Sequence, residues 1–252
     1  MTALGVERRE QILRLLDDEG RVLASDLAPR LGVSLDTVRR DLDELGASGA
    51  LRRVRGGALP PSKTSPKFSE RATEDVSAKR AIADVAVERL VKPGQLLALG
   101  GGTSVRELAR RLPDDLQATV LTTAPDVAVA LLDHAGLEVI LLGGPVNPET
   151  RTVTGVEAIQ ALATVRPDIC FLGACSVHAE AGVTVLHREE ALVDRAMLQA
   201  SAATAVLSAN AKLGTAGPYV IGATDEIDYL VTDEADGTEA IARIGVEVIA
   251  AR

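Results

Sequence analysis

Aromatic residues are almost missing from this chain of 252 residues, which has no Trp, two Phe and two Tyr. Proteins that bind single-stranded nucleic acid stack bases on aromatic rings, so we do not expect that kind of binding. The core must be built from Val, Leu, Ile and Ala, which is feasible because hydrophobic residues make up 46% of the chain. Together with 25% charged residues, this composition is typical of a globular protein rather than a disordered one.

Cysteine and long apolar runs are also scarce. The two cysteines, Cys170 and Cys175, have neither the C-x-x-C spacing nor a zinc pattern, so we expect buried, reduced thiols and no disulfide. No apolar run reaches about 18 residues, and the first ten residues lack the apolar stretch of a signal peptide. We therefore expect a cytoplasmic protein with no membrane partner. No His, Cys and carboxylate cluster has metal-ligand spacing, and we predict neither a metal nor a cofactor.

The net charge of -9 is unevenly distributed. Residues 1–60 carry ten basic and ten acidic side chains, whereas the remainder carries 17 basic and 26 acidic ones. The excess of acid therefore lies entirely in the second part of the chain. A neutral N-terminal segment can still bind DNA if its arginines share one face.

Residues 1–59 have the pattern of a winged helix-turn-helix. Apolar spacing predicts helices over residues 7–18, 26–31 and 35–45. Ser25 and Ser34 are the expected N-caps of the second and third helices, and Gly32 separates them as in a helix-turn-helix. A Gly-Gly pair at 56–57 predicts a hairpin over residues 51–59.

Arginines are concentrated on the third helix and the hairpin. In a helix-turn-helix the start of the second paired helix enters the major groove, and Arg both contacts guanine edges and binds phosphate. The hairpin would contact the DNA backbone or the minor groove. The expected DNA-binding residues are Ser34, Thr37, Arg39, Arg40, Arg53 and Arg55. The alternative is that these side chains form the solvated face of a protein-interaction domain.

A Pro- and Ser-rich stretch marks residues 60–75 as a linker before a second domain at residues 76–252. After a predicted helix at Val76–Val91, six apolar runs predict strands at Leu96–Leu99, Ala118–Thr123, Glu138–Gly144, Ile169–Cys175, Thr204–Ser208 and Tyr229–Asp233. Amphipathic stretches predict helices at Ser104–Leu112, Asp126–Ala135, Ala158–Ala163, Arg188–Ala202 and Thr238–Ile244. Apolar strands that alternate with helices indicate an α/β domain with a mainly parallel sheet.

Small, hydroxyl and cationic residues follow several of these strands, where α/β sheets bind ligands. A strand, three glycines, two hydroxyls and a helix suit a phosphate, because glycines allow close approach and helix N-termini attract anions. Thr103 or Ser104 would cap that helix. Lys212 is the expected point charge for the phosphate, with Arg151 as a second candidate. The expected effector-binding residues are Gly101, Gly102, Thr103, Ser104, Thr122, Thr123, Gly143, Gly144, Gly173 and Lys212. The alternatives are glycines that serve only a tight chain reversal and an exposed surface lysine.

The chain resembles the DeoR-type transcriptional regulators over nearly its whole length. In the N-terminal part the resemblance is carried by VS-xx-TVRRDL followed by G-x-L-x-R-x-x-GGA. In the C-terminal part it is carried by LGGGTSVRELA, VLTTAPDVA, VILLGGPVNPETRTVTG, DICFLGACSV and AKLG. It implies that the six residues above lie at the DNA surface. It also implies a sensor domain similar in fold to ribose-5-phosphate isomerase, with a phosphorylated sugar or sugar derivative bound by Gly101 to Ser104, Thr122, Thr123 and Lys212.

The sequence departs from the family pattern at several polar positions. Gly100 stands where Asp is common, Thr123 where Asn is common, and Asn147 where Arg is common. Asp194 stands where Lys usually precedes the R-A-M stretch, and Arg55 replaces a frequent His. The altered sensor positions indicate an atypical effector or weakened sensing.

We therefore predict a sequence-specific regulator, a repressor by family, that binds double-stranded operator DNA as a dimer or higher homo-oligomer. An effector that prefers one arrangement of the two domains would change operator affinity. One rival function is a sugar-phosphate isomerase with a DNA-binding head, for which Glu190 and Asp168 are the candidate bases. The other is an interaction scaffold that does not bind DNA.

Overall fold

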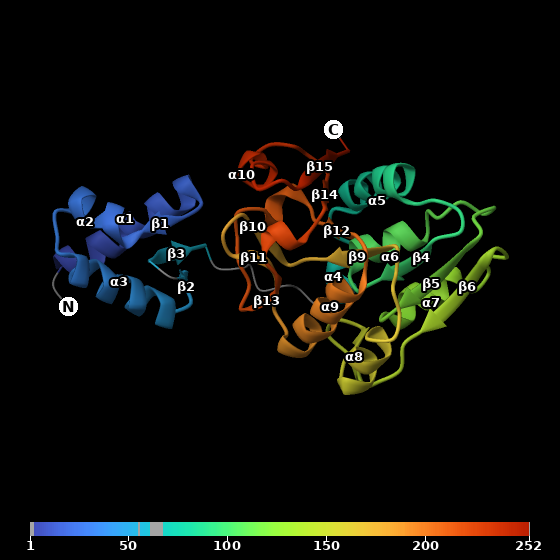
Figure 1. Ribbon diagram of the computed structural model, residues 1–252. Helices are drawn as coiled ribbons and strands as arrows, with labels where there is room; N and C mark the ends of the chain where they lie inside the picture. The colour runs from blue at the N-terminus through green and yellow to red at the C-terminus, as the bar shows by residue number, and fades with distance from the viewer. Residues whose placement is uncertain (1–2, 55, 61–67, 252) are drawn as a thin grey trace.

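The computed structural model describes residues 3–54, 56–60 and 68–251. Figure 1 shows a small N-terminal part, which we call the head (residues 3–59), beside a larger α/β part, which we call the body (residues 68–251). The described residues include no helix that is long and apolar enough to cross a membrane.

The head contains three helices and a three-stranded antiparallel sheet of order β1-β3-β2. Its elements are α1 (Ala3–Glu19), β1 (Val22–Leu23), α2 (Ala24–Leu31), α3 (Leu35–Ala47), β2 (Arg52–Val54) and β3 (Gly57–Leu59). The predicted order of helices and hairpin is confirmed. Residue 57 must be glycine, because a Cβ there would lie 2.0 Å from the carbonyl oxygen of Val22 on the neighbouring strand.

The helix caps predicted for the head are confirmed only in part. Ser34 caps α3 as predicted, since its side chain accepts a hydrogen bond from the backbone N–H of Thr37 at 3.2 Å. The predicted Ser25 cap is wrong: α2 begins two residues earlier, at Ala24 after the N-cap Leu23, and the Ser25 hydroxyl donates to Asp26 instead. Gly32 ends α2 with a φ of 63°, a conformation that favours glycine.

A small apolar core holds the head together. It contains Ile12 and Leu16 from α1, Leu27 from α2, and Val38 and Leu42 from α3. These side chains recur at helical spacing, so each helix buries one stripe. The core draws only on residues of the head, which explains how the head keeps its shape beside the body.

The body is built on seven parallel strands in the order β15-β14-β12-β9-β4-β5-β6. These strands are β4 (Leu96–Leu99), β5 (Ala118–Thr122), β6 (Leu137–Leu141), β9 (Ile169–Gly173), β12 (Thr204–Leu207), β14 (Tyr229–Thr232) and β15 (Glu247–Ala250). The helices are α4 (Phe68–Arg71), α5 (Val76–Leu90), α6 (Thr103–Ala109), α7 (Pro125–Leu131), α8 (Val156–Leu162), α9 (Arg188–Ala200) and α10 (Glu239–Ala242). The predicted α/β fold class is confirmed.

Both faces of the sheet are covered, and the side chains of β9 show how. Ile169 and Phe171 pack into one core with α5, α6 and α7, while Cys170 and Leu172 pack into a second core with α8, α9 and α10. Alternate residues of a strand point to opposite faces, so a strand buried on both sides is apolar throughout. This is why the five inner strands β4, β5, β9, β12 and β14 could be recognised from their apolar runs, whereas β6 lies at the edge of the sheet and is largely exposed.

The structure also contains short elements that the sequence did not predict. They are α4, the edge strand β15, a hairpin of β7 (Val146–Asn147) and β8 (Thr152–Val153), and an antiparallel sheet of β10 (Ser176–His178), β11 (Gly182–Val185) and β13 (Tyr219–Gly222). Two short 3-10 helices, η1 (Asn210–Lys212) and η2 (Thr224–Glu226), complete the body. Several predicted elements end earlier than expected; β9, for example, stops at Gly173 rather than at Cys175.

Candidate DNA-binding surface and effector pocket

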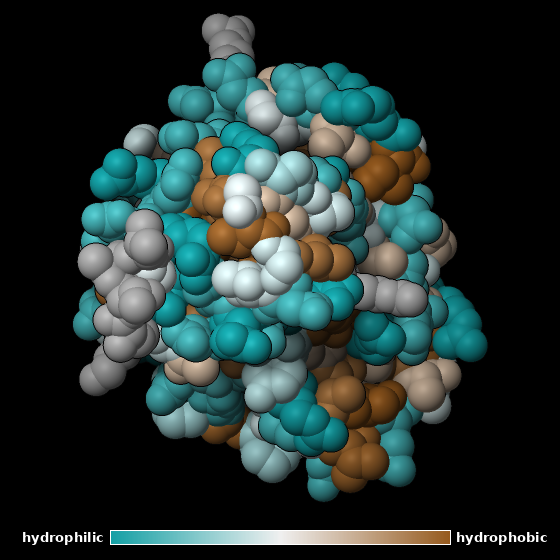
Figure 2. Space-filling model, turned by 90° about the vertical axis from the view of Figure 1, so that its left-hand side faces the viewer, coloured by the Kyte–Doolittle hydropathy of each residue, from teal (hydrophilic) through white to brown (hydrophobic). Residues whose placement is uncertain are grey.

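The first turns of α3 lie at the surface of the head. Ser34, Arg39 and Arg40 are exposed and Thr37 is half-buried, while Val38 between them is fully buried. Arg39 approaches only Asp36 of its own helix, at 3.4 Å, and within the described residues Arg40 makes no ion pair. Figure 2, which looks onto the end of the molecule that carries the head, shows a mostly hydrophilic surface. The predicted recognition residues of α3 are therefore accessible together.

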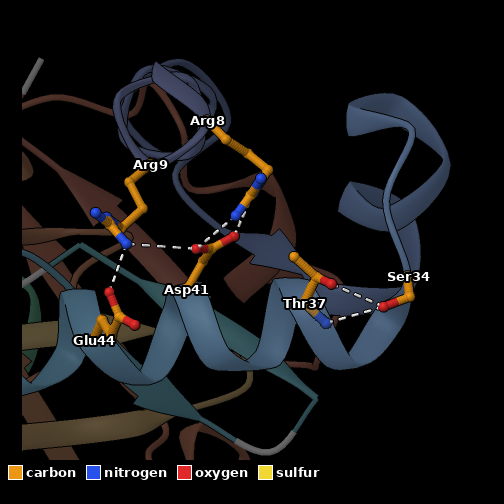
Figure 3. A network of polar contacts seen from close by, with 6 residues as sticks. All are labelled: Arg8, Arg9, Ser34, Thr37, Asp41 and Glu44. Carbon is orange, nitrogen blue, oxygen red and sulfur yellow. Dashed lines mark hydrogen bonds and ion pairs between the residues drawn. The ribbon is translucent and has the colours of Figure 1, made fainter. Parts of the chain in front are cut away.

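Two arginines of α1 hold the recognition helix from behind (Figure 3). The carboxylate of Asp41, on α3, is buried and accepts two hydrogen bonds from Arg8, at 2.5 and 3.1 Å. Arg9 lies 3.7 Å from Asp41 and pairs with Glu44 at 2.5 Å. The hydrogen bond that Arg8 donates to Asp41 raises the pKa of the Arg8 guanidinium. These contacts fix α3 against α1, a role for Asp41 that the sequence did not suggest.

We call the hairpin of β2 and β3 the wing, and the sequence predicts that two of its arginines bind DNA. Arg53 donates to the Asp43 carboxylate at 2.8 Å and to the Gly57 carbonyl at 2.7 Å. It also lines a groove of about 460 Å³ between the head and the body. Its guanidinium thus ties the wing to α3, and its contact with DNA stays a prediction. Arg55 lies outside the described residues.

The strand order locates the natural ligand site of the body. From β4 the chain runs outward through β5 and β6 on one side, and through β9, β12, β14 and β15 on the other. The ends of β4 and β9 therefore form the switch point of the sheet, where α/β proteins bind ligands. A pocket lies there, bordered by the loop at residues 101–104, by residues 173–175 and by Lys212.

Glycines let the two loops of the pocket approach each other. A Cβ at Gly173 would lie 2.7 Å from the carbonyl oxygen of Gly101, and a Cβ at Gly101 would lie 2.0 Å from Thr152. Gly102 has a φ of 106° and caps α6, so the predicted capping by Thr103 or Ser104 is wrong. The pocket itself is small, about 20 Å³, close to the least that holds one water molecule.

Lys212 and Arg71 supply positive charge to the pocket wall. The ammonium of Lys212 donates to the carbonyl oxygen of Ala174 at 3.3 Å, and burial lowers its pKa. The buried ammonium of Lys79 donates to the carbonyl oxygens of Arg71 and Glu74, which anchors the segment that carries Arg71. Sequence analysis missed Arg71 because it lies in the stretch assigned to the linker.

Three guanidinium groups surround the ring of Phe68 at one side of this pocket. The distances from the ring centre are 4.7 Å for Arg151, 5.1 Å for Arg106 and 5.6 Å for Arg71. The face of an aromatic ring attracts cations, which helps to hold these like charges close together. Arg151 is the second predicted phosphate ligand, whereas no role for Phe68 or Arg106 was predicted from the sequence pattern.

The other predicted effector residues do not line the pocket. Thr122 is buried. Its hydroxyl donates a hydrogen bond to the carbonyl oxygen of Leu99 at 2.7 Å and accepts one from the backbone N–H of Ala124. Thr123 is buried, and its hydroxyl has no hydrogen-bond partner within the described residues. Gly143 and Gly144 follow β6, where a Cβ on Gly144 would meet the backbone of Thr154 at 2.5 Å.

Acidic residues of α9 form the remaining wall. Glu190 lines the pocket, and burial raises the pKa of its carboxyl to about 7, while nearby Arg71 opposes the shift. Asp194 lies one helical turn further on and is fully buried; burial and the charge of Glu190 raise its pKa. Asp168, the other candidate base, accepts a hydrogen bond from Leu96 at the opposite ends of β4 and β9, so it cannot serve this pocket.

One hairpin connects the pocket with the head. Its strands β10 and β11 are flanked at the pocket by Cys175 and Val185, which line it. At the other end Glu180 pairs with Arg21 of the head, beside a cavity of about 180 Å³ lined by residues of both parts. The Nδ1 of His178 accepts the backbone N–H groups of Glu180 and Ala181, which orders this turn. The β10–β11 hairpin thus lies between the pocket and the head.

Comparison with known proteins identifies the family of this chain. Residues 8–64 match the DeoR-like helix-turn-helix domain, and residues 74–234 match the DeoR C terminal sensor domain. The chain belongs to the DeoR family of transcriptional regulators. The resemblance stated from the sequence is thereby confirmed.

Curated DeoR-family relatives align along almost the whole chain. A protein of Escherichia coli O157:H7 named as an aga operon transcriptional repressor is 35% identical, over 96% of this chain and 93% of that protein. The transcriptional regulator GlpR of Haloferax volcanii is 32% identical, over 98% of both chains. The transcriptional repressor GlcR of Bacillus subtilis is 32% identical, over 96% and 95%.

Among solved structures, ribose 5-phosphate isomerase A of Methanocaldococcus jannaschii aligns with a TM-score of 0.38 and 21% identity. The alignment covers 54% of this chain and 53% of that one. A likeness this low carries no argument about activity. The DeoR-family assignment rests on the two domain matches and the relatives.

Proposed function

We propose that this DeoR-family protein is a repressor that binds operator DNA through α3 and acts in the cytoplasm, where that DNA is. The observation that carries the proposal is the exposed start of α3, where the exposed Arg39 and Arg40 follow the buried Val38. Helix-turn-helix proteins insert this part of the helix into the major groove. Ser34 and Thr37 contact bases or phosphates from the same turn, and Arg53 and Arg55 contact the DNA backbone from the wing.

A gel-shift titration with the DNA upstream of the protein's own gene tests this proposal. Replacing Arg39 or Arg40 by alanine should each weaken binding roughly tenfold, because a base or phosphate contact is worth about 1–3 kcal/mol. Arg166→Ala, at an exposed arginine of the body, is the matched control and should bind as the unmodified protein does. Binding should also weaken steeply with salt. Unchanged affinity in both α3 variants would refute the assignment of the recognition helix.

We propose further that the effector is a phosphorylated sugar derivative bound at the switch point. Lys212 and Arg71 supply charge for the phosphate, and Thr103, Ser104 and the backbone of Gly101 and Gly102 supply hydrogen-bond donors. The hydroxyl of Thr123, the Nε of Arg106 and one oxygen of Asp126 are buried without hydrogen-bond partners among the described residues. Buried polar atoms are normally satisfied, so these atoms are candidates for contacts with the sugar once the pocket opens. A thermal-shift screen of sugar phosphates tests this, since a true ligand stabilises the fold increasingly with concentration.

The isomerase function is the weaker candidate. Catalysis of that kind requires a carboxylate base beside the phosphate, and of the two candidates only Glu190 lines the pocket. The curated relatives of this chain are named as transcriptional repressors. We expect no turnover of ribose 5-phosphate, and turnover would favour the enzyme.

We also propose that the protein acts as a homodimer that pairs two heads on repeated half-sites. The candidate interface is the β6 edge of the body. Val129 and Leu132 on α7 are 66% and 70% exposed, and Ile140 and Leu141 on β6 are 40% and 47% exposed. A sheet edge with exposed apolar side chains favours association.

A further inference from the structure

The wall formed by α9 places two carboxyl groups beside a pocket that is otherwise cationic. Glu190 lines the pocket, and Asp194 lies one helical turn further along the same helix. Side chains four residues apart on a helix are neighbours. Within the described residues neither carboxyl makes a hydrogen bond or an ion pair within 4.0 Å.

The charged groups around Glu190 do not compensate both carboxyls. The charge of Arg71 on α4 lowers the pKa of Glu190, against the effect of burial. Lys212 on η1 is directed to the carbonyl of Ala174, and the thiol of Cys175 is neutral because burial raises its pKa. Asp194 is buried beside the half-buried Glu190, and it does not line the pocket. Two neighbouring carboxyls in such surroundings do not readily ionise together without a further cation.

We infer that the effector carries a positive as well as a negative charge, namely that it is an amino sugar phosphate with a free ammonium group. Lys212 and Arg71 receive the phosphate, and Glu190, backed by Asp194, receives the ammonium. This inference rests on the proposed effector site and specifies its ligand.

The expected preference for an amino sugar phosphate over other sugar phosphates depends on which groups of each ligand can pair with the two carboxyls. An ammonium group offers three N–H donors and a charge that allows the carboxyl pair to ionise. A sugar hydroxyl offers one donor and no charge, so the pair must keep its proton. An N-acetyl group brings bulk and no charge. In this chain position 194 is Asp, whereas Lys is the usual residue there in the family pattern. A cation next to Glu190 is thereby replaced by a second carboxyl, and an ammonium group of the ligand takes the place of the missing cation.

Calorimetric titration of the full-length protein with four probes tests the inference. The probes are glucosamine 6-phosphate, glucose 6-phosphate, N-acetylglucosamine 6-phosphate and inorganic phosphate. Glucosamine 6-phosphate should bind at least tenfold more tightly than either of the other sugar phosphates. Equal affinity for all three sugar phosphates would overturn the inference and leave the proposed sensor function standing. If no probe bound, the proposed effector site itself would fail, and the inference with it.

Variants of α9 separate the role of the carboxyl pair from a general effect on the helix. Glu190→Gln should abolish the preference for glucosamine 6-phosphate, and Asp194→Asn should reduce it severalfold. Glu189→Gln is the matched control, because Glu189 is an exposed neighbour that pairs only with Arg188. Circular dichroism checks that each variant folds; if Asp194→Asn does not, Glu190→Gln and the probe series decide the question.

Proton exchange gives a readout that a purely structural role would not affect. At pH 7 the carboxyl of Glu190 is partly protonated, because its pKa is raised to about 7. An ammonium group stabilises the ionised pair, so binding should release protons. Titrations in buffers of different ionisation enthalpy should show release with glucosamine 6-phosphate in excess of that with glucose 6-phosphate, which has the same phosphate. Equal proton counts for the two ligands would contradict the contact.

Discussion

At the scale of single residues, Asp41 is the side chain on which the position of the recognition helix depends most directly. It is buried, and it receives the guanidinium of Arg8 through two hydrogen bonds and lies near that of Arg9. Removing one partner of a buried ion pair leaves the other charges without compensation, which is costly. Asp41 thus stabilises the head and orients the arginines that lie on the opposite side of the same helix.

We expect Asp41→Asn to lower the free energy of unfolding by about 2 kcal/mol, less than for a fully buried pair because Arg8 and Arg9 are partly exposed. Urea denaturation measures this loss. Asp17→Asn, at an exposed position of α1, is the control and should change stability by less than about 0.5 kcal/mol. An Asp41 variant as stable as the control would show that Arg8 and Arg9 do not depend on this carboxylate.

Residue-level prediction from the sequence succeeded for some local features and failed for others. The Ser34 cap and the exposure of Arg39 and Arg40 were predicted correctly, whereas the predicted Ser25 cap was wrong. The pairing of Asp41 with Arg8 joins residues 33 positions apart, and the ring of Phe68 meets Arg151, which lies in the turn between β7 and β8. Such contacts depend on the tertiary fold, and nothing in the local sequence pattern specifies them.

At the scale of elements, the meeting of the loops after β4 and β9 defines the pocket. Gly173→Ala would place a Cβ 2.7 Å from the carbonyl oxygen of Gly101, so one loop must move. We expect a loss of about 1–3 kcal/mol in stability, measured by urea denaturation, together with weaker binding of sugar phosphates. Gly143→Ala is the control, because a Cβ there meets nothing within 4 Å. Equal stability of the two variants would mean that the loops do not pack as closely as the structure has them.

Elements were predictable where an apolar run was long enough to recognise. Five of the six predicted strands, β4, β5, β9, β12 and β14, lie inside the sheet and are covered on both faces. The sixth, β6, lies at the edge and is largely exposed, yet its run of Leu, Val and Ile was recognised. The strands β7, β8 and β10 have two or three residues each, too few to establish a period, and the partly buried strands β13 and β15 were also missed.

At the scale of the whole molecule, the contact between Arg21 and Glu180 is the most direct link between the head and the hairpin that borders the pocket. Both side chains are substantially exposed, so the pair adds little to stability. We expect Arg21→Ala and Glu180→Ala to unfold as the unmodified protein does, yet to reduce the change in operator affinity that the effector causes. Gel shifts with and without the best sugar phosphate from the thermal screen measure this ratio. The double exchange Arg21→Glu with Glu180→Arg should restore it, and an unaltered ratio in the single variants would exclude this route.

The assembly can be tested at the same scale. Leu132→Lys together with Ile140→Lys introduces charge into the proposed interface at the β6 edge and should convert the dimer to a monomer in sedimentation experiments, with a loss of operator affinity. Leu192→Lys, at another exposed apolar residue on α9, is the control and should remain dimeric. A dimer that persisted in the double variant would place the interface elsewhere.

The small size of the pocket has a consequence for the rate at which the proposed effector binds. A space of about 20 Å³ cannot admit a sugar phosphate as it stands, so entry must follow an excursion in which the β10–β11 hairpin or the segment of Arg71 withdraws. The rate of complex formation should then level off at high ligand concentration, at the frequency of that excursion. Regulation by this protein would respond to sustained changes in metabolite supply, and the pace of the response would be set by the chain rather than by diffusion.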